Sequence, residues 1–85
     1  MTISVIVCAH NEEQFVAACL HSLLAQSRPP DEVLLINNAS SDGTGTVARA
    51  IPGVRVIDET RKGLVVARER GRGEGRGDLL VYVDA

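Results

Sequence analysis

Short apolar runs alternate with polar segments that contain glycine or proline along the whole chain. Four runs have the length and the nearly unbroken apolar character of buried strands. They lie at Ile3–Cys8, Glu32–Ile36, Val54–Ile57 and Leu79–Val83. Because strands that are buried on both faces lack a strict apolar-polar alternation, this pattern predicts a parallel sheet covered on both faces.

The first two segments between these runs are predicted to be helical. Apolar residues recur at helical spacing within Glu13–Gln26, and Asn11 suits the N-cap of that helix. The prolines of Ser27–Pro30 end it, because proline removes a backbone donor. The second helix is expected to run from an N-cap at Asp42 to about Ala50.

A third helix is predicted over Gly63–Arg72. Gly73 and Gly75 follow, and each glycine costs a helix interior about 1 kcal/mol relative to alanine, so this helix is expected to end early or fray. The resulting order, β-α-β-α-β-α-β, is typical of the α/β class with a Rossmann-like parallel sheet.

Ligands of such sheets bind beyond the carboxyl ends of the strands, near the point where the strand order reverses. The segments that reach this edge are Ala9–Glu12, Asn37–Gly43, Glu59–Gly63 and the chain from Asp84 onward. Ala9 is small enough to let a flat ligand approach the backbone, and Asn11 offers both donor and acceptor groups, although it can equally start the helix. Asn37–Gly43 suits an anion or a ribose, or a turn alone.

The composition is that of an ordinary globular domain and does not indicate a particular ligand. Hydrophobic residues make up 45% and aromatic residues 2%, so the core must be aliphatic, and the net charge is -2. Neither nucleic acid nor an anionic membrane is required by this balance. Two cysteines form no disulfide framework, no leader precedes the first strand, and no apolar run spans a bilayer, so a cytoplasmic setting is expected.

Two other functions fit parts of the sequence. Gly43–Ala48 matches a G-x-G-x-x-A dinucleotide pattern, but it follows the second strand, and Asp58 lies 15 residues beyond Gly43 (58 minus 43), short of the expected spacing of about 20. Arg70–Arg76 is an alternative RNA-binding tract, although it lacks aromatic residues and Glu74 interrupts its charge.

A resemblance to a known family runs in order along nearly the whole chain. The segments that carry it are Ser4–Glu13, Cys19–Leu23 with Gln26, Pro30–Thr44, Gly63 with Ala67-Arg68, and Gly77–Ala85. In these segments the chain resembles the amino-terminal part of the family 2 glycosyltransferases of the GT-A fold. The resemblance implies a partial GT-A domain over residues 1–85 that binds the nucleotide of a sugar donor.

The resemblance also implies roles for particular residues. Nucleotide-sugar contacts are expected from Ala9, His10, Asn11, Glu12, Asn37, Ala39, Ser40, Arg68 and Asp84. Asn37 takes the place of an acidic residue that accepts a hydrogen bond from the base. Asp84 would be the first aspartate of an Asp-x-Asp motif that binds the diphosphate through Mg²⁺ or Mn²⁺. A UDP-sugar is the expected donor, GDP- and dTDP-sugars are alternatives, and the acceptor (saccharide, lipid or protein) stays open.

The chain departs from the family pattern in ways that affect these expectations. Asn37 can accept a hydrogen bond only without charge, Cys8 replaces a common proline, and His10 replaces a common tyrosine. The sequence ends at Ala85, so the second metal-binding aspartate and the acceptor side are expected outside these residues. The 85 residues alone are expected to bind nucleotide weakly, to transfer nothing and to self-associate through the unpaired edge of the fourth strand, and the parent protein is expected in the cytoplasm or peripherally at a membrane.

Overall fold

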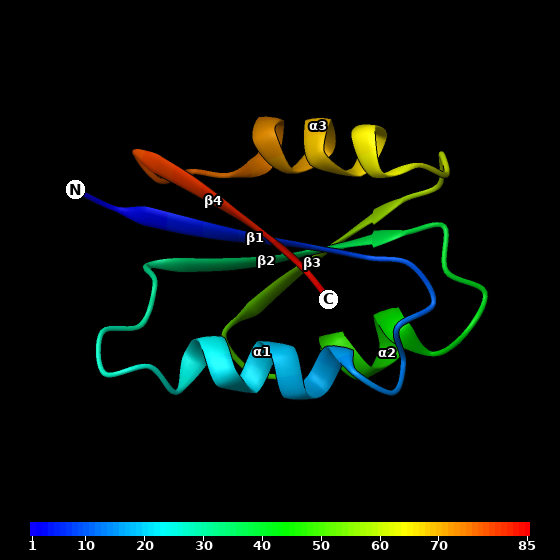
Figure 1. Ribbon diagram of the computed structural model, residues 1–85, viewed down its shortest axis with the longest axis horizontal. Coiled ribbons are helices and arrows are strands. Elements are labelled where there is room, and N and C mark those ends of the chain that lie inside the picture. The colour runs from blue at the N-terminus through cyan, green and yellow to red at the C-terminus, as the bar shows by residue number, and fades with distance from the viewer.

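The computed structural model describes all residues from Met1 to Ala85 and places a four-stranded sheet between two layers of helices (Figure 1). The elements are β1 (Ile3–Ala9), α1 (Val16–Leu24), β2 (Glu32–Asn38), α2 (Thr44–Arg49), β3 (Val54–Glu59), α3 (Leu64–Glu74) and β4 (Leu79–Asp84). All strand pairs are parallel and the order is β3-β2-β1-β4. The predicted α/β class and its alternating β-α units are confirmed.

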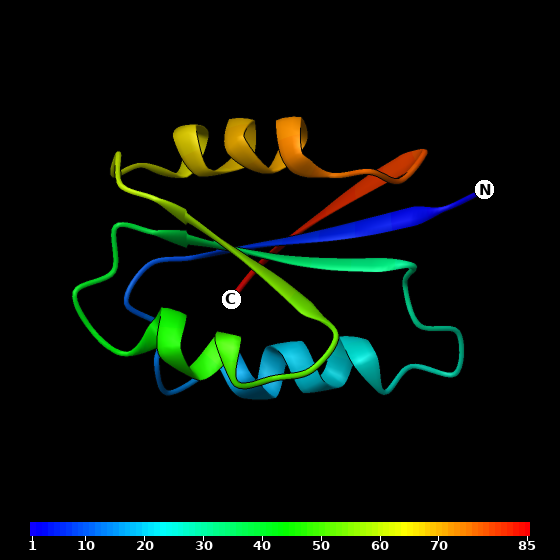
Figure 2. The same ribbon diagram turned by 180° about the vertical axis from the view of Figure 1, so that it is seen from behind.

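The two faces of the sheet are covered by different helices, with α1 and α2 on one face and α3 on the other (Figures 1 and 2). Val5 and Val7 of β1 point into the core beneath α1, where Leu20 is fully buried. Ile6 points to the opposite core, against Ala67 of α3. Because successive strand residues enter different cores, the strands need unbroken apolar runs.

The strand order reverses at β1. The chain first adds β2 and β3 on one side of β1 and then returns to add β4 on the other side. Within the sheet, Cys8 lies opposite Ile36 of β2 and Asp84 of β4, so three strand ends meet at one edge. This edge is where a ligand site is expected.

The predicted start of the first helix was wrong. The helix begins at Val16, three residues after Glu13, and Asn11 is not its N-cap. Asn11 instead adopts a left-handed backbone with φ of 53°, and its Oδ1 accepts a hydrogen bond from Ser41 N at 2.8 Å. The Asn11 side chain therefore bonds to the loop after β2 instead of capping α1.

The prediction that glycines would end the third helix early was also wrong, because α3 continues through Gly73 to Glu74. The packing of Gly71 against the core beneath α3 explains part of the difference. A Cβ atom on Gly71 would lie 2.4 Å from Cγ2 of Ile6, so glycine lets α3 approach β1 closely. Close packing offsets the low helix propensity of glycine.

The β4 strand lies at an edge of the sheet, as predicted, with β1 as its neighbour. Leu79, Val81 and Tyr82 are exposed on it. Self-association through this edge stays a prediction. No helix in the structure has both the length and the apolar character needed to cross a membrane.

Candidate functional site

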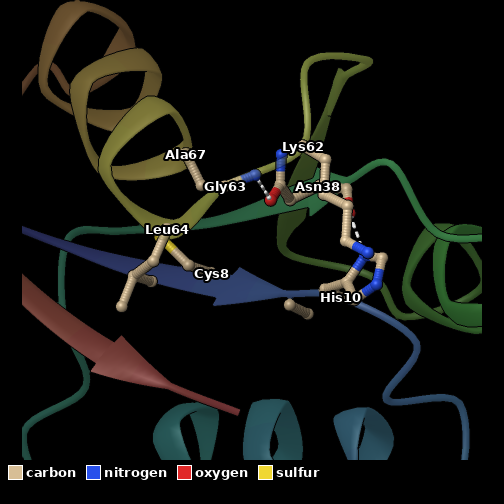
Figure 3. Close-up of a pocket in the computed structure, with 8 residues that line it drawn as sticks. Cys8, His10, Asn38, Lys62, Gly63, Leu64 and Ala67 are labelled. Carbon is tan, nitrogen blue, oxygen red and sulfur yellow. Dashed lines mark hydrogen bonds between the residues drawn. The ribbon is translucent and has the colours of Figure 1, made fainter.

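A cavity of about 210 Å³ lies where the carboxyl ends of β1 and β2 meet the first turn of α3 (Figure 3). Backbone and side chains from both strands and from the loop before α3 form its walls. The lining residues are Cys8, Ala9, His10, Asn38, Lys62, Gly63, Leu64 and Ala67. Its wall is partly apolar and its rim is polar, which is typical of small-molecule sites.

His10 lies on the rim of the cavity with its imidazole turned toward the end of β2 (Figure 3). Its Nδ1 lies 2.6 Å from the backbone oxygen of Asn38. Because a carbonyl oxygen only accepts, Nδ1 carries the proton in this arrangement. In the neutral ring Nε2 is then an acceptor, and Nδ2 of Asn11 lies 3.4 Å from it.

Asn38 was missing from the residues predicted by sequence, although it connects three parts of the site. Its side chain is only 4% exposed. Nδ2 donates to the backbone oxygen of Arg61 at 2.6 Å and that of Glu59 at 3.4 Å, while Oδ1 accepts from Gly63 N at 2.9 Å. Asn38 therefore fixes the loop between β3 and α3, which forms one wall of the cavity.

Asn37, the predicted contact to the base, lies outside this cavity. Its Nδ2 donates to Oδ1 of Asp58 at 3.0 Å, and its own Oδ1 is buried without a hydrogen-bond partner. With Ala39 and Ser40 it lines a second hollow of about 250 Å³ at the ends of β2 and β3. Consecutive strand residues point to opposite sides, so Asn37 and Asn38 cannot both face one cavity.

The loops after β1 and β2 are joined by hydrogen bonds from backbone to side chain. Asn11 N donates to Oγ of Ser40 at 3.0 Å, and Glu12 N donates to Oγ1 of Thr44 at 2.9 Å. Ala39, like Asn11, has a left-handed backbone, with φ of 51°. Such conformations cost energy in residues other than glycine and are held here by the surrounding bonds. Glu12 thus contributes its backbone to the loop structure.

Asp84 and Arg68 lie together beside the cavity, at the end of β4 and on α3. Nη2 of Arg68 is 3.6 Å from Oδ2 of Asp84, and the two side chains are 47% and 61% exposed. Arg68 is therefore the charged partner of Asp84 within the chain. Burial raises the pKa of the neighbouring Cys8 thiol, and the carboxylate of Asp84 raises it further.

No group of three or more His, Cys, Asp or Glu residues is arranged to hold a metal ion. Asp84 is thus a single carboxylate at the strand end. Mg²⁺ is commonly bound through one or two carboxylates together with phosphate oxygens of a substrate, and carboxylate also suits Mn²⁺. A single exposed carboxylate fits that mode of binding, in which the ligand supplies other oxygens.

The glycines of the dinucleotide-like pattern are packed against the protein's own side chains. A Cβ on Gly43 would lie 2.4 Å from Oε1 of Glu13, and one on Gly45 would lie 2.6 Å from Nδ2 of Asn37. Neither glycine lines a cavity. The geometry therefore gives no support to a dinucleotide site at this turn.

Two of the three arginines of the tract considered for RNA binding, Arg70 and Arg72, are paired with carboxylates of the chain itself. Arg70 pairs with Glu74 at 3.2 Å and with Glu59 at 3.5 Å, and Arg72 pairs with Glu69 at 3.4 Å. These contacts are typical of a solvated helix face and offer no ordered surface for bases.

Glu59, at the end of β3, is a buried carboxylate held by Arg61. Side-chain and backbone hydrogen bonds from Arg61 lower the pKa of Glu59 from 4.5 to about 2. A lowered pKa in the folded state stabilises the protein above pH 4.5, and this contribution is lost as the pH falls toward 2. Glu59→Gln is therefore expected to flatten the decline in the free energy of unfolding across that window, as measured by denaturant titration. Identical slopes in the two proteins would contradict this role for Glu59.

Comparison with known proteins identifies the family of this chain. Residues 4–85 match the sequence model of the family described as glycosyl transferase family 2. The chain belongs to glycosyl transferase family 2. The resemblance carried by Ser4–Glu13, Pro30–Thr44 and Gly77–Ala85 is confirmed.

Curated relatives of this glycosyltransferase chain include proteins from bacteria and archaea. It is 34% identical over 86 residues to the uncharacterized glycosyltransferase EpsJ of Bacillus subtilis, a match that covers 96% of the chain and 25% of EpsJ. It is 32% identical over 89 residues to glycosyltransferase AglE of Haloferax volcanii, covering 96% of the chain and 29% of AglE. The chain thus spans between a quarter and a third of the length of these relatives.

Solved glycosyltransferase structures share the fold. One is glucosyl-3-phosphoglycerate synthase of Mycobacterium tuberculosis, crystallised with Mn²⁺, UDP and glucosyl-3-phosphoglycerate. The match covers 98% of the present chain and 33% of the synthase chain, with 29% identity and a TM-score of 0.85. Another is mannosyltransferase PcManGT of Pyrobaculum calidifontis, in complex with GDP-Man and Mn²⁺. The match covers 96% of the present chain and 26% of the PcManGT chain, with 27% identity and a TM-score of 0.87. The four-stranded sheet is the Rossmann-like part of the GT-A fold.

Proposed function

We propose that this chain binds the nucleotide of a nucleoside-diphosphate-sugar donor, as part of an enzyme that transfers the sugar to an acceptor. The observation that carries the proposal is the cavity between His10, Asn38 and the first turn of α3, with Asp84 at the adjacent strand end. This arrangement supports a base site and a diphosphate-binding carboxylate at one edge of the sheet.

The cavity suits a flat, partly apolar group such as a base. Ala9, Leu64 and Ala67 provide apolar surface, and His10 and Asn38 provide polar groups at the rim. Lys62 adds a positive charge next to the amino terminus of α3, where an anion is favoured. The phosphates would then extend from the cavity toward Asp84.

Asp84 is the residue that would hold Mg²⁺ or Mn²⁺, together with phosphate oxygens of the donor. When bound there, the metal offsets negative charge on the nucleoside diphosphate as the sugar departs. Arg68, 3.6 Å from Asp84, is placed to pair with a phosphate oxygen through its guanidinium group.

We propose a UDP-sugar as the donor, with GDP- and dTDP-sugars as alternatives. The mycobacterial relative bound to UDP supports the first choice, and the archaeal relative bound to GDP-Man supports the second. The acceptor belongs to the saccharide, lipid or protein class and would be bound by the remainder of the enzyme. We place that enzyme in the cytoplasm or peripherally at a membrane.

Thermal unfolding with UDP, GDP and dTDP, each with and without Mn²⁺, tests this function. A ligand that binds only the folded protein stabilises it by about 2.7 kcal/mol at 100 times its Kd. We expect Lys62→Glu to weaken nucleotide binding about tenfold, because it reverses a charge at the cavity that faces the phosphates.

Arg72→Glu is the matched control for Lys62→Glu. It makes the same change of charge, on α3 and not in the loop before it, and Arg72 is 70% exposed and does not line the cavity. It should therefore retain the wild-type affinity. Absence of a shift with every nucleotide, or equal losses in the two variants, would contradict binding in this cavity.

A further inference from the structure

The carboxamide of Asn11 connects the loop after β2 with a residue of the cavity. Its Oδ1 accepts from Ser41 N at 2.8 Å, and its Nδ2 lies 3.4 Å from Nε2 of His10. The other ring nitrogen, Nδ1, lies 2.6 Å from the backbone oxygen of Asn38. Hydrogen bonds thus run from Ser41 through Asn11 and His10 to Asn38, and the last two of these residues line the cavity.

We propose that Asn11 is a positioning residue that holds the His10 imidazole, as its Nδ1–H tautomer, against the wall of the cavity and thereby sets the affinity for the donor nucleotide. The proposal gives Asn11 an indirect role, because both ends of its side chain are already engaged with protein groups. It rests on the proposed binding of a nucleoside diphosphate in this cavity.

The backbone of Asn11 supports this role. Its φ of 53° lies in the left-handed region, which asparagine and glycine tolerate better than other residues. The helix that follows starts only at Val16, so Asn11 is not needed to cap it. Asn11 N in turn donates to Oγ of Ser40 at 3.0 Å, which fixes the residue from both its backbone and its side chain.

The two contacts of His10 select a single tautomer. The carbonyl oxygen of Asn38 requires a proton on Nδ1, and the amide of Asn11 requires an unprotonated Nε2. Loss of the Asn11 side chain removes the second of these requirements. The imidazole can then rotate or take up the Nε2–H tautomer, and the rim of the cavity loses its fixed shape.

Asn11→Gly tests the proposal, because glycine accepts the left-handed backbone and removes only the carboxamide. Nucleotide affinity is measured by calorimetric titration with UDP and with GDP in the presence of Mn²⁺. We expect a loss on the order of tenfold, as typical for one net hydrogen bond in a binding site. Gln14→Gly is the control in the same loop, since Gln14 is exposed and should leave the affinity unchanged.

Nitrogen-15 NMR of the imidazole provides a readout that a purely structural role would not move. The chain has two histidines, so a His21→Gln background leaves His10 alone. We expect the Nδ1–H tautomer to predominate with Asn11 present and the Nε2–H form to increase in Asn11→Gly. An unchanged tautomer population, or equal nucleotide affinity of the two proteins, would overturn the proposal. Absence of binding by the wild-type protein would instead overturn the proposed function, and the NMR result would still decide the role of Asn11.

Discussion

Replacing Asp84 with asparagine is expected to abolish the gain in nucleotide affinity that we predict Mn²⁺ or Mg²⁺ to give the wild-type protein. Asp84 is exposed at the end of β4, and we propose its carboxylate as the ligand of a divalent cation. Mutation of a residue that only hydrogen-bonds to a metal ligand typically lowers metal affinity or activity 10- to 100-fold. We therefore expect loss of the ligand itself to cost about 100-fold or more in metal-dependent binding.

Asp58→Asn is a close control for this substitution. Asp58 is also a strand-end aspartate, is 54% exposed, and is paired with an arginine, Arg49. It lines the second hollow and not the cavity beside α3. Calorimetric titration of UDP with and without Mn²⁺ should show a normal metal effect in Asp58→Asn. A metal effect that survives in Asp84→Asn would exclude Asp84 as the ligand.

Leucine substitutions at Gly71 and Gly73 are expected to change stability in opposite directions. A side chain on Gly71 would enter the space of Ile6, which is fully buried, and the Cβ alone would lie 2.4 Å from Cγ2 of Ile6. Overpacking of this kind costs about 1–3 kcal/mol, occasionally more, and a complete leucine side chain places Gly71→Leu at the upper end. A Cβ on Gly73 meets no atom within 4 Å. Gly73→Leu should therefore stabilise the helix by up to about 1 kcal/mol.

Denaturant titration of the two variants against the wild type measures both effects. The same residue type is introduced two positions apart on one helix, so a difference in sign reports the packing of α3 against β1. If both variants were destabilised alike, the close approach at Gly71 would not be the reason for its glycine. If both were stabilised, helix propensity would dominate at both positions.

The order of elements and the sheet type could be predicted because each depends on local sequence. Each nearly unbroken apolar run forms a strand, and each segment between two runs contains a helix. Helix ends were less predictable, since they depend on distant contacts. The close contact with Ile6 explains the glycine at position 71 within α3. The hydrogen bond from Ser41 N holds the Asn11 side chain in the loop, outside α1. These partners are not visible in a local pattern.

The site could be predicted as far as which strand ends meet, but not which side chains face the cavity. Asn37 and Asn38 are chemically identical neighbours, and only their position along β2 decides that Asn38 lines the cavity and Asn37 does not. Successive residues of a strand face opposite sides of the sheet, so an error of one residue in the predicted register exchanges the positions of Asn37 and Asn38. Asp84 and Arg68 come from separate elements and were both predicted as nucleotide contacts. The structure brings Nη2 of Arg68 to 3.6 Å from Oδ2 of Asp84, and their contact with a nucleotide stays a prediction.

Binding of a donor nucleotide in the cavity beside α3 is tested most directly by NMR titration of the nitrogen-15-labelled protein with UDP and Mg²⁺. The predicted result is that amide shifts concentrate on the residues of the cavity walls, which are Cys8–His10, Asn38, Lys62–Leu64 and Ala67. Shifts that gather instead around the hollow lined by Asn37 and Asp58, or no shifts at saturating UDP, would contradict it.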